Sequence, residues 1–223
     1  MTAFCKPTLI IFDLDGTLID SVFDLADGVD GMLAHFNKPA SGVERVRGWV
    51  GNGSVKLVER AMAWADISAD QLDEAHEVFL AKYANATSKT VEYEGVTEGL
   101  HRLMEAGLTL TLCTNKPTQF LPKILDGMGW TDMFSCVIGG DSLPTKKPDP
   151  MPLLHICQTL HVDTSCAVMV GDSVNDIKAG QDAGMRTLAL TYGYNYGTPI
   201  SQSNPDGVFD DFGALVDFIL QAN

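Results

Sequence analysis

Two carboxylates, Asp13 and Asp15, directly follow the apolar run Leu9–Phe12 near the start of the chain. Four consecutive apolar residues, β-branched in the middle, are typical of a parallel strand that is buried on both faces. In an extended chain, residues i and i+2 point the same way, so both carboxylates are predicted to share one space at the end of this strand. Adjacent carboxylates repel each other, and the pair therefore predicts a bound cation, a shared proton, or both.

Polar residues also follow three later strands that the sequence predicts. They are Thr114 and Asn115 after residues 108–113, Lys147 in the loop after residues 136–139, and Asp172 with Asp176 after residues 167–170. The strands of a parallel sheet all end along one edge, where such folds bind ligands, so these groups are expected to meet Asp13 and Asp15. Taken alone, the two aspartates could equally be ordinary turn residues, since Asp favours turns.

The residue types in this set fit phosphoryl transfer. Mg²⁺ prefers oxygen ligands and usually takes one or two carboxylates, which Asp13 and Asp172 could supply. Lys147 offers a positive charge and three donors for a phosphoryl group. Asp15 then remains available as a general acid and base.

Some of these residues also have structural explanations. The hydroxyl of Thr114 and the amide of Asn115 can donate to phosphoryl oxygens, but the pair could instead cap the helix that follows. Lys147 could be solvated, with its neighbour Lys146 pointing inward. Asp176 lies in the first turn of a predicted helix, where the helix dipole favours acids, so a structural role is the alternative to a functional one.

Four motifs, in order along the whole chain, resemble those of the haloacid dehalogenase superfamily. They are Asp13-Leu14-Asp15-Gly16-Thr17, Thr114-Asn115, Lys147-Pro148 and Gly171-Asp172-Ser173-Val174-Asn175-Asp176. The resemblance implies that Asp13 is a nucleophile that forms an aspartyl-phosphate, with Asp15 protonating the leaving alcohol and then deprotonating water.

The same resemblance implies a metal site and a supporting residue behind it. Mg²⁺ would be held by Asp13, the carbonyl of Asp15 and Asp172. Asp176 would then orient Lys147 or a metal-bound water.

Other branches of the superfamily are alternatives. The dehalogenase branch lacks an acid at the position of Asp15, because a halide leaving group needs no proton. Phosphonate-cleaving relatives use a lysine of the cap domain, for which Lys56 is the nearest candidate here, although the first motif differs from theirs. Sugar-phosphate mutases and broader sugar- or nucleotide-phosphate phosphatases share the four motifs and stay open.

The order of predicted elements indicates an α/β fold with a doubly wound parallel sheet, a Rossmann-like core and an inserted all-helical cap domain. We expect the core to comprise residues 1–19 and 92–223, and the cap residues 20–91. Helices are predicted at residues 22–36, 55–65 and 69–86 in the cap, and at 97–106, 118–128, 151–160, 174–183 and 212–221 in the core. The core helices alternate with strands at 108–113, 136–139, 167–170 and 187–191.

The cap contains a glycine-rich loop, Val46-Arg47-Gly48-Trp49-Val50-Gly51-Asn52-Gly53. This loop is similar to the cap segment of bacterial phosphoglycolate phosphatases, which implies 2-phosphoglycolate as the substrate. Arg47 could bind a substrate carboxylate through paired hydrogen bonds, or it could be a solvated surface residue. Trp49 is interpreted as a packing anchor of the loop.

Composition limits the partners. The net charge of −14 argues against nucleic acid and anionic membranes, which both require a basic footprint, and leaves a small phosphorylated substrate. The five cysteines show no zinc-site spacing, and no apolar run reaches the roughly 18 residues of a membrane helix. Without a signal-peptide pattern, a cytoplasmic monomer or homodimer is expected. A non-enzymatic phosphate-binding protein would lack a catalytic group, and none is missing here.

Overall fold

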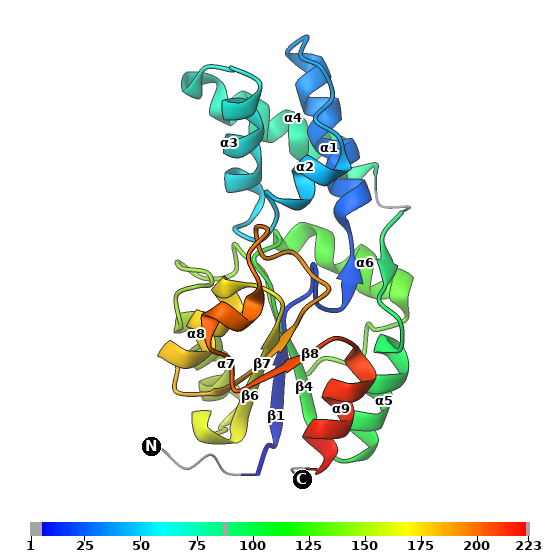
Figure 1. The fold of residues 1–223 in the computed structure, drawn as a ribbon, viewed down its shortest axis with the longest axis vertical. Helices are drawn as coiled ribbons and strands as arrows, with labels where there is room; N and C mark the ends of the chain where they lie inside the picture. The colour runs from blue at the N-terminus through cyan, green and yellow to red at the C-terminus, as the bar shows by residue number, and fades with distance from the viewer. Residues whose placement is uncertain (1–5, 87–88, 222–223) are drawn as a thin grey trace.

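The computed structural model of the chain describes residues 6–86 and 89–221. These residues include a six-stranded parallel sheet in the order β5-β4-β1-β6-β7-β8 (Figure 1). Its strands are β1 (Leu9–Phe12), β4 (Thr109–Cys113), β5 (Cys136–Ile138), β6 (Ala167–Gly171), β7 (Arg186–Leu190) and β8 (Gly207–Phe209). The apolar run of β1 lies between β4 and β6 and is fully buried, which confirms the prediction of a central strand.

Side chains alternate between the two faces of β1, and helices cover both faces. Ile10 and Phe12 pack with α5 (Val96–Glu105), α6 (Leu121–Met128) and α9 (Phe212–Gln221). Leu9 and Ile11 face the opposite layer, formed by α7 (Met151–Leu160) and α8 (Val174–Asp182). The predicted doubly wound α/β fold is therefore confirmed.

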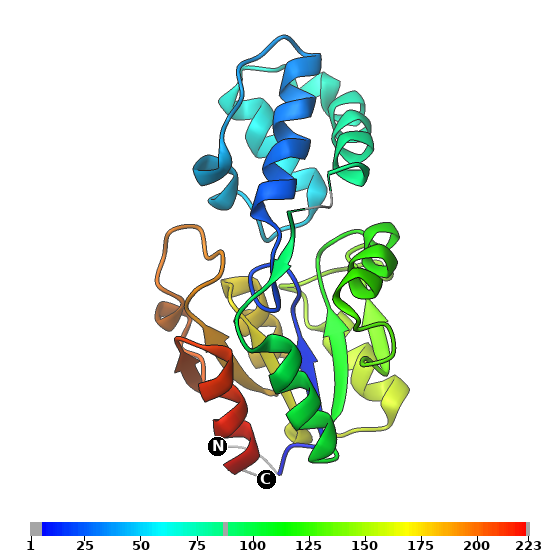
Figure 2. The ribbon, with the colours of Figure 1, turned by 90° about the vertical axis from the view of Figure 1, so that its right-hand side faces the viewer.

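Four helices form a second group above the carboxyl edge of the sheet (Figures 1 and 2). They are α1 (Val22–His35), α2 (Val43–Arg47), α3 (Ser54–Trp64) and α4 (Leu72–Ala84). The chain enters and leaves this group through an antiparallel pair of short strands, β2 (Ile19–Asp20) and β3 (Val91–Glu92). Within the described ranges, no helix has both the length and the apolar character needed to cross a membrane.

Several short elements were not predicted. The five-residue helix α2 and the strands β2, β3 and β8 lack the apolar periodicity by which longer elements are recognised. The predicted helix at residues 69–86 begins instead with a 3-10 turn, Ala69–Gln71, before α4. Ser21 occupies the N-cap position of α1, but its hydroxyl makes no cap hydrogen bond and donates to Asp15 instead.

A buried carboxylate on α1 ties down the segment that returns to the core. Asp24 is fully buried, and its Oδ2 accepts hydrogen bonds from the backbone N–H of Thr90 at 2.8 Å and from its hydroxyl at 2.6 Å. The backbone N–H of Lys89 donates to the same carboxylate at 3.1 Å. These hydrogen bonds attach residues 89–90, where the chain leaves the helical group, to α1, the first helix of that group.

We expect Asp24→Ala to lower the free energy of unfolding by about 3 kcal/mol, because it removes the buried carboxylate that accepts hydrogen bonds from the backbone N–H groups of residues 89–90 and from the Thr90 hydroxyl. Urea denaturation measures the change. Asp27→Ala is the matched control, since Asp27 lies on the same helix and pairs with exposed Lys89 in solvent, where such pairs contribute little. Equal losses in the two variants would contradict this role of Asp24.

Candidate active site

Lys147 joins two of the predicted site residues. Its side chain is 1% exposed, and its Nζ lies 2.9 Å from Oδ1 of Asp13 and 2.6 Å from Oδ1 of Asp176. Asp13 follows β1, while Asp176 lies in the first turn of α8. The neighbouring Lys146 is only partly buried, so Lys147 is the inward-pointing lysine of this loop.

Asp172, which directly follows β6, is held beside this pair by hydrogen bonds from two donors. Its Oδ1 accepts from the hydroxyl of Thr17 and its Oδ2 from the backbone N–H of Tyr194, both at 2.6 Å. Gly16 has a φ of 92°, and a Cβ there would lie 2.3 Å from Oδ2 of Asp172. A Cβ at Gly193 would lie 2.2 Å from the same oxygen. Only glycines at these two positions leave room for the carboxylate.

Asp176 has both a structural and an electrostatic contact. Its Oδ2 accepts from the backbone N–H of Ser173 at 3.0 Å and from the Ser173 hydroxyl at 2.6 Å, which completes a capping box at the start of α8. Its Oδ1 faces Lys147. The capping contacts fix the orientation of the carboxylate that positions the lysine.

Three carboxylates therefore meet in one buried space. One oxygen from each of Asp13, Asp172 and Asp176 lies within 4.8 Å of the others. Burial, and then repulsion by Asp176, raise the pKa of Asp13 to about 7 in spite of Lys147. Burial and the same repulsion also raise the pKa of Asp172 well above its usual range. One lysine does not balance three carboxylates, so the cluster is suited to a divalent cation.

The hydrogen bonding of this cluster also fits a bound cation. Among the described residues, Oδ1 of Asp13, Oδ1 of Asp176 and Nζ of Lys147 are buried and make no well-aligned hydrogen bond, although they lie close together. Such groups normally find partners in protein or ligand. Both oxygens of Asp172 meet neutral donors of the chain, whereas Asp176 pairs with the charged ammonium group of Lys147. The chain therefore neutralises the charge of Asp176 more than that of Asp172, which makes Asp172 the better carboxylate for a cation.

Asp15 points away from the carboxylate cluster. It accepts a hydrogen bond of 2.5 Å from the hydroxyl of Ser21 and pairs with Nζ of Lys116 at 2.9 and 3.1 Å. Lys116 lies over the ring of Tyr83 at 4.9 Å. Burial alone would lower the pKa of Lys116, but the neighbouring Asp15 carboxylate raises it, so the ammonium group stays charged.

Lys116 and Ser21 were not identified as site residues from the sequence. Lys116 belongs to the same loop as Thr114 and Asn115, which follows β4. Its place in this loop could have identified Lys116 as a site residue, because the loop lies at the edge of the sheet where ligands bind. Ser21 directly precedes a helix, where serine is typical of an N-cap. Its position therefore indicates helix capping rather than a place in the site.

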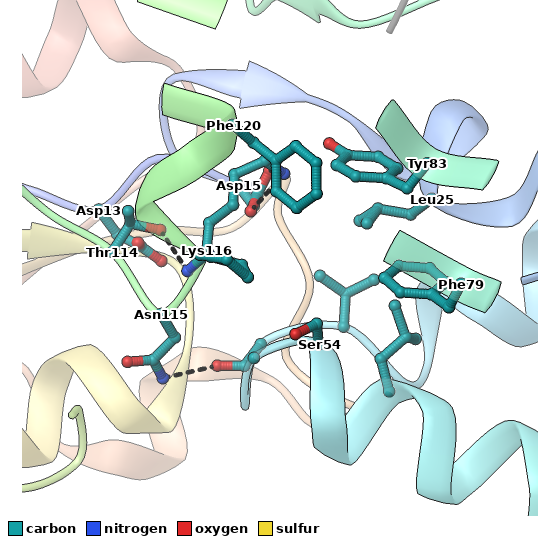
Figure 3. Close-up of a pocket in the computed structure, with 15 residues that line it drawn as sticks. Asp13, Asp15, Leu25, Ser54, Phe79, Tyr83, Thr114, Asn115, Lys116 and Phe120 are labelled. Atoms are coloured by element: carbon teal, nitrogen blue, oxygen red, sulfur yellow. Dashed lines mark hydrogen bonds and ion pairs between the residues drawn. The ribbon is translucent and has the colours of Figure 1, made fainter. Parts of the chain in front are cut away.

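Asp13 and Asp15 line one cavity between the sheet edge and the helical group (Figure 3). Asp13, Thr114 and Lys116 lie on one side of it, and Leu25, Phe79 and Tyr83 on the other. The apolar lining residues are Leu25, Val50, Leu57, Phe79, Tyr83, Pro117 and Phe120. The cavity thus combines a charged end with an apolar wall contributed mainly by the helical group.

Asn115 connects three loops around this cavity. Its Nδ2 donates to the carbonyl oxygens of Gly51 at 3.0 Å and Lys147 at 2.9 Å. The carbonyl of Gly51 also accepts from Nδ2 of Asn175 at 3.2 Å, and Asn52 donates to Oδ1 of Asn175. One amide hydrogen of Asn115 therefore holds the glycine-rich loop against the core, and the other holds the loop of Lys147.

Thr114 keeps its predicted place at the charged end. It is buried and lines the cavity, and its Oγ1 accepts from the backbone N–H of Lys116 at 3.2 Å. A hydroxyl that accepts one hydrogen bond still has its own hydrogen to donate. Thr114 can therefore donate to a ligand that reaches Asp13.

Two cations of the helical group lie outside the lining of this cavity. Arg47 faces Asp20, with Nη2 3.7 Å from Oδ2, and its guanidinium lies 5.4 Å from the centre of the Tyr194 ring. The side chain of Lys56 is 57% exposed and pairs with Glu59 on α3. The structure thus brings neither Arg47 nor Lys56 to Asp13. Trp49, in the same glycine-rich loop as Arg47, packs against the ring of Trp64.

Comparisons with known proteins agree with this arrangement. Residues 10–190 match the family of haloacid dehalogenase-like hydrolases. The chain is 54% identical to phosphoglycolate phosphatase of Psychrobacter arcticus, covering 96% of each protein. It is 44% identical to phosphoglycolate phosphatase 1 of Pseudomonas aeruginosa, covering 94% of this chain and 79% of that protein. A crystal structure of a predicted phosphoglycolate phosphatase from Haemophilus somnus shares the fold with a TM-score of 0.92 and 38% identity, covering 96% of this chain and 98% of that one.

The raised pKa of Asp13 leads to a prediction for stability. In the metal-free protein this pKa is about 7 against a usual value of 3.8, so the folded chain holds the proton more tightly than the unfolded chain. The resulting stabilisation is complete below the usual value and is lost as the pH rises through the folded-state value. A cation binds the deprotonated carboxylates, so its stabilising effect grows over the same window.

We therefore expect Mg²⁺ to raise Tm, and to raise it more at about pH 8 than at about pH 5.5. Thermal unfolding with and without the metal measures both shifts. In Asp172→Asn the metal-induced shift should largely disappear. A metal-induced rise in Tm that is the same at both pH values in the unsubstituted protein would contradict binding at this cluster.

Proposed function

The chain belongs to the haloacid dehalogenase-like hydrolases, and we propose that it is a Mg²⁺-dependent phosphatase that converts 2-phosphoglycolate to glycolate and phosphate. The observation that carries the chemistry is that Asp13 and Asp15 open into one cavity while Lys147 contacts Asp13 from behind. The named substrate is supported by the relatives called phosphoglycolate phosphatase, one of them 54% identical across 96% of this chain.

Asp13 and Asp172, together with the backbone carbonyl of Asp15, are the proposed Mg²⁺ ligands. Mg²⁺ bound there would offset the excess negative charge of the cluster and polarise the phosphoryl group. Asp176 is not among these proposed ligands, because it caps α8 and its charge is offset by the ion pair with Lys147.

Asp13 is the proposed nucleophile. Its carboxylate oxygen would attack phosphorus as the bond to the ester oxygen breaks, which yields an aspartyl-phosphate and the alcohol. The contact with Lys147 lowers the pKa of Asp13, opposing the effect of burial, and so favours the ionised form that attack requires. Lys147 and the free hydrogen of the Thr114 hydroxyl can then donate to the charge on the phosphoryl oxygens.

Asp15 is the proposed general acid and base. It would give a proton to the leaving ester oxygen and later take one from the water that hydrolyses the aspartyl-phosphate. Ser21 and Lys116 hold its carboxylate in place at the cavity. A second acid at this position separates the chain from dehalogenases, whose leaving group needs no proton.

The cavity favours a very small substrate over a sugar phosphate. Its wall of leucine, valine and aromatic side chains offers few partners to the hydroxyls of a sugar. Burying such hydroxyls without partners costs about 1–3 kcal/mol each, so hexose phosphates should bind poorly. The exposed position of Lys56 also removes the lysine that phosphonate cleavage would need.

We also propose that residues 20–91 act as a cap on the core of residues 1–19 and 92–223. The contacts of Asn115 and Asn175 with the glycine-rich loop support this role, because breaking them would open the cavity to substrate. Residues 1–5, 87–88 and 222–223, which fall within these ranges, lie outside the described residues. The cytoplasmic location and the monomeric or dimeric state stay predictions.

Phosphate release from a panel of phosphomonoesters tests the substrate. With Mg²⁺ present, we expect kcat/KM for 2-phosphoglycolate to exceed that for hexose phosphates and nucleotides by about a hundredfold, or 2.7 kcal/mol of transition-state binding. Fastest turnover of a hexose phosphate would remove the named substrate and favour the broader sugar-phosphate phosphatase or mutase.

Asp13→Asn should abolish turnover, with a loss in kcat of roughly a thousandfold or more, because an amide cannot form the acyl-phosphate. Phosphate release under saturating substrate measures it. Lys178→Met, which breaks an exposed ion pair on α8, serves as the control and should turn over normally. Substantial activity in Asp13→Asn would refute the assignment of the nucleophile.

A further inference from the structure

Lys116 is a buried cation that belongs to the lining of the cavity and pairs there with Asp15. Its side chain is 2% exposed, and its Nζ contacts both oxygens of Asp15. An ammonium group has three donors, and two hydrogen bonds go to Asp15, so one donor is left for another ligand. The ring of Tyr83, 4.9 Å away, supports the lysine on its other side.

The charges around the cavity are few. Among the described residues that line it, Asp13 and Asp15 are acidic and Lys116 is the one cation. Arg47, Lys56 and Lys146 do not belong to the lining. A substrate with a second negative group, besides the phosphoryl group, therefore meets a single positive side chain once it is inside.

We propose that Lys116 binds the carboxylate of the substrate and so determines the preference for a phosphorylated acid. This inference rests on the proposed function, because it takes 2-phosphoglycolate as the substrate. Arg47, which the sequence indicated for this task, is instead engaged with Asp20 and Tyr194 at the edge of the helical group.

The dimensions of the substrate agree with this position. In 2-phosphoglycolate a single methylene separates the ester oxygen from the carboxyl carbon, so the carboxylate must lie next to the reacting group. Asp15 acts on the ester oxygen in the proposed mechanism, and Lys116 is in direct contact with Asp15. A lysine at this place can reach the carboxylate without a change in the position of the phosphoryl group.

Ser54 offers a second polar group across the cavity, on the cap side (Figure 3). It is the first residue of α3, and its Oγ lies 2.8 Å from Nε2 of His76. The amino end of a helix favours a negative charge. Ser54 and Lys116 thus come from the two parts of the molecule, and a carboxylate between them would link closure of the cap to the presence of the correct substrate.

The alternative is that Lys116 only orients and neutralises Asp15. A lysine that acts through Asp15 would affect every phosphomonoester equally, since all of them need the general acid. A lysine that binds the carboxylate would affect only substrates that carry one. The ratio of kcat/KM between two matched substrates separates these roles.

The test compares 2-phosphoglycolate with 2-hydroxyethyl phosphate, in which a hydroxymethyl group replaces the carboxylate. In Lys116→Met we expect the ratio of kcat/KM for the two substrates to fall by roughly 30- to 100-fold, the value of a charge-assisted hydrogen bond. Most of that fall should come from a higher KM for 2-phosphoglycolate. Lys116→Arg, which keeps the charge, should retain part of the preference.

Two further variants serve as controls. Lys178→Met makes the same substitution at an exposed position of α8 and should leave the ratio unchanged. Arg47→Met removes a cation near the cavity but outside its lining, and it should change the ratio far less than Lys116→Met. Lys116→Gln gives the same measurement if Lys116→Met does not fold, as checked by thermal unfolding.

An equal loss for both substrates in Lys116→Met would overturn the role of Lys116 and leave the phosphoglycolate assignment intact. A collapse of the ratio in Arg47→Met, but not in Lys116→Met, would overturn it as well. If the native enzyme itself shows no preference for 2-phosphoglycolate over 2-hydroxyethyl phosphate, then the proposed substrate fails, and the inference fails with it.

Discussion

The structure depends on the burial of three carboxylates around one ammonium group. Asp13, Asp172 and Asp176 each place an oxygen within 4.8 Å of the others, and Lys147 contacts two of them. Such an excess of negative charge is unfavourable in a buried site, and it persists only because the fold fixes each member. Glycines leave room for one carboxylate and a capping box holds another, and the unbalanced charge that remains makes a cation part of the site.

The helical group completes the site by closing over this charged edge. It supplies most of the apolar wall of the cavity, while Asn115 and Asn175 bind the carbonyl of Gly51 from the core side. Asp24 fixes the returning segment at residues 89–90 to the first helix of the group. A single cavity thus joins a charged side from the core to an apolar wall that comes mainly from the helical group.

Much of this arrangement could be predicted from the sequence, because the reactive residues directly follow strands that the sequence itself makes recognisable. Residues 9–18 hold a buried strand, its terminal carboxylates and a glycine together, so their place at the sheet edge follows from the sequence. The positions of the Arg47 and Lys116 side chains could not be predicted in this way. Their directions depend on how the helical group packs on the core, through Tyr194 and Tyr83 respectively, and no local pattern encodes that contact. Asn115 was expected to donate to phosphate, and its use in holding three loops became visible only when those loops were placed in space.

The central claim is that the phosphoryl group passes through Asp13. The most direct measurement is rapid quenching of Asp15→Asn with Mg²⁺ and a phosphomonoester that has a good leaving group, followed by borohydride reduction and peptide mass spectrometry. Without the base that activates water, the phosphoenzyme should accumulate, and reduction of the acyl-phosphate should convert Asp13, and no other aspartate, to homoserine. Homoserine at another aspartate, or a stable phosphate ester on Thr17 or Ser21, would contradict the account.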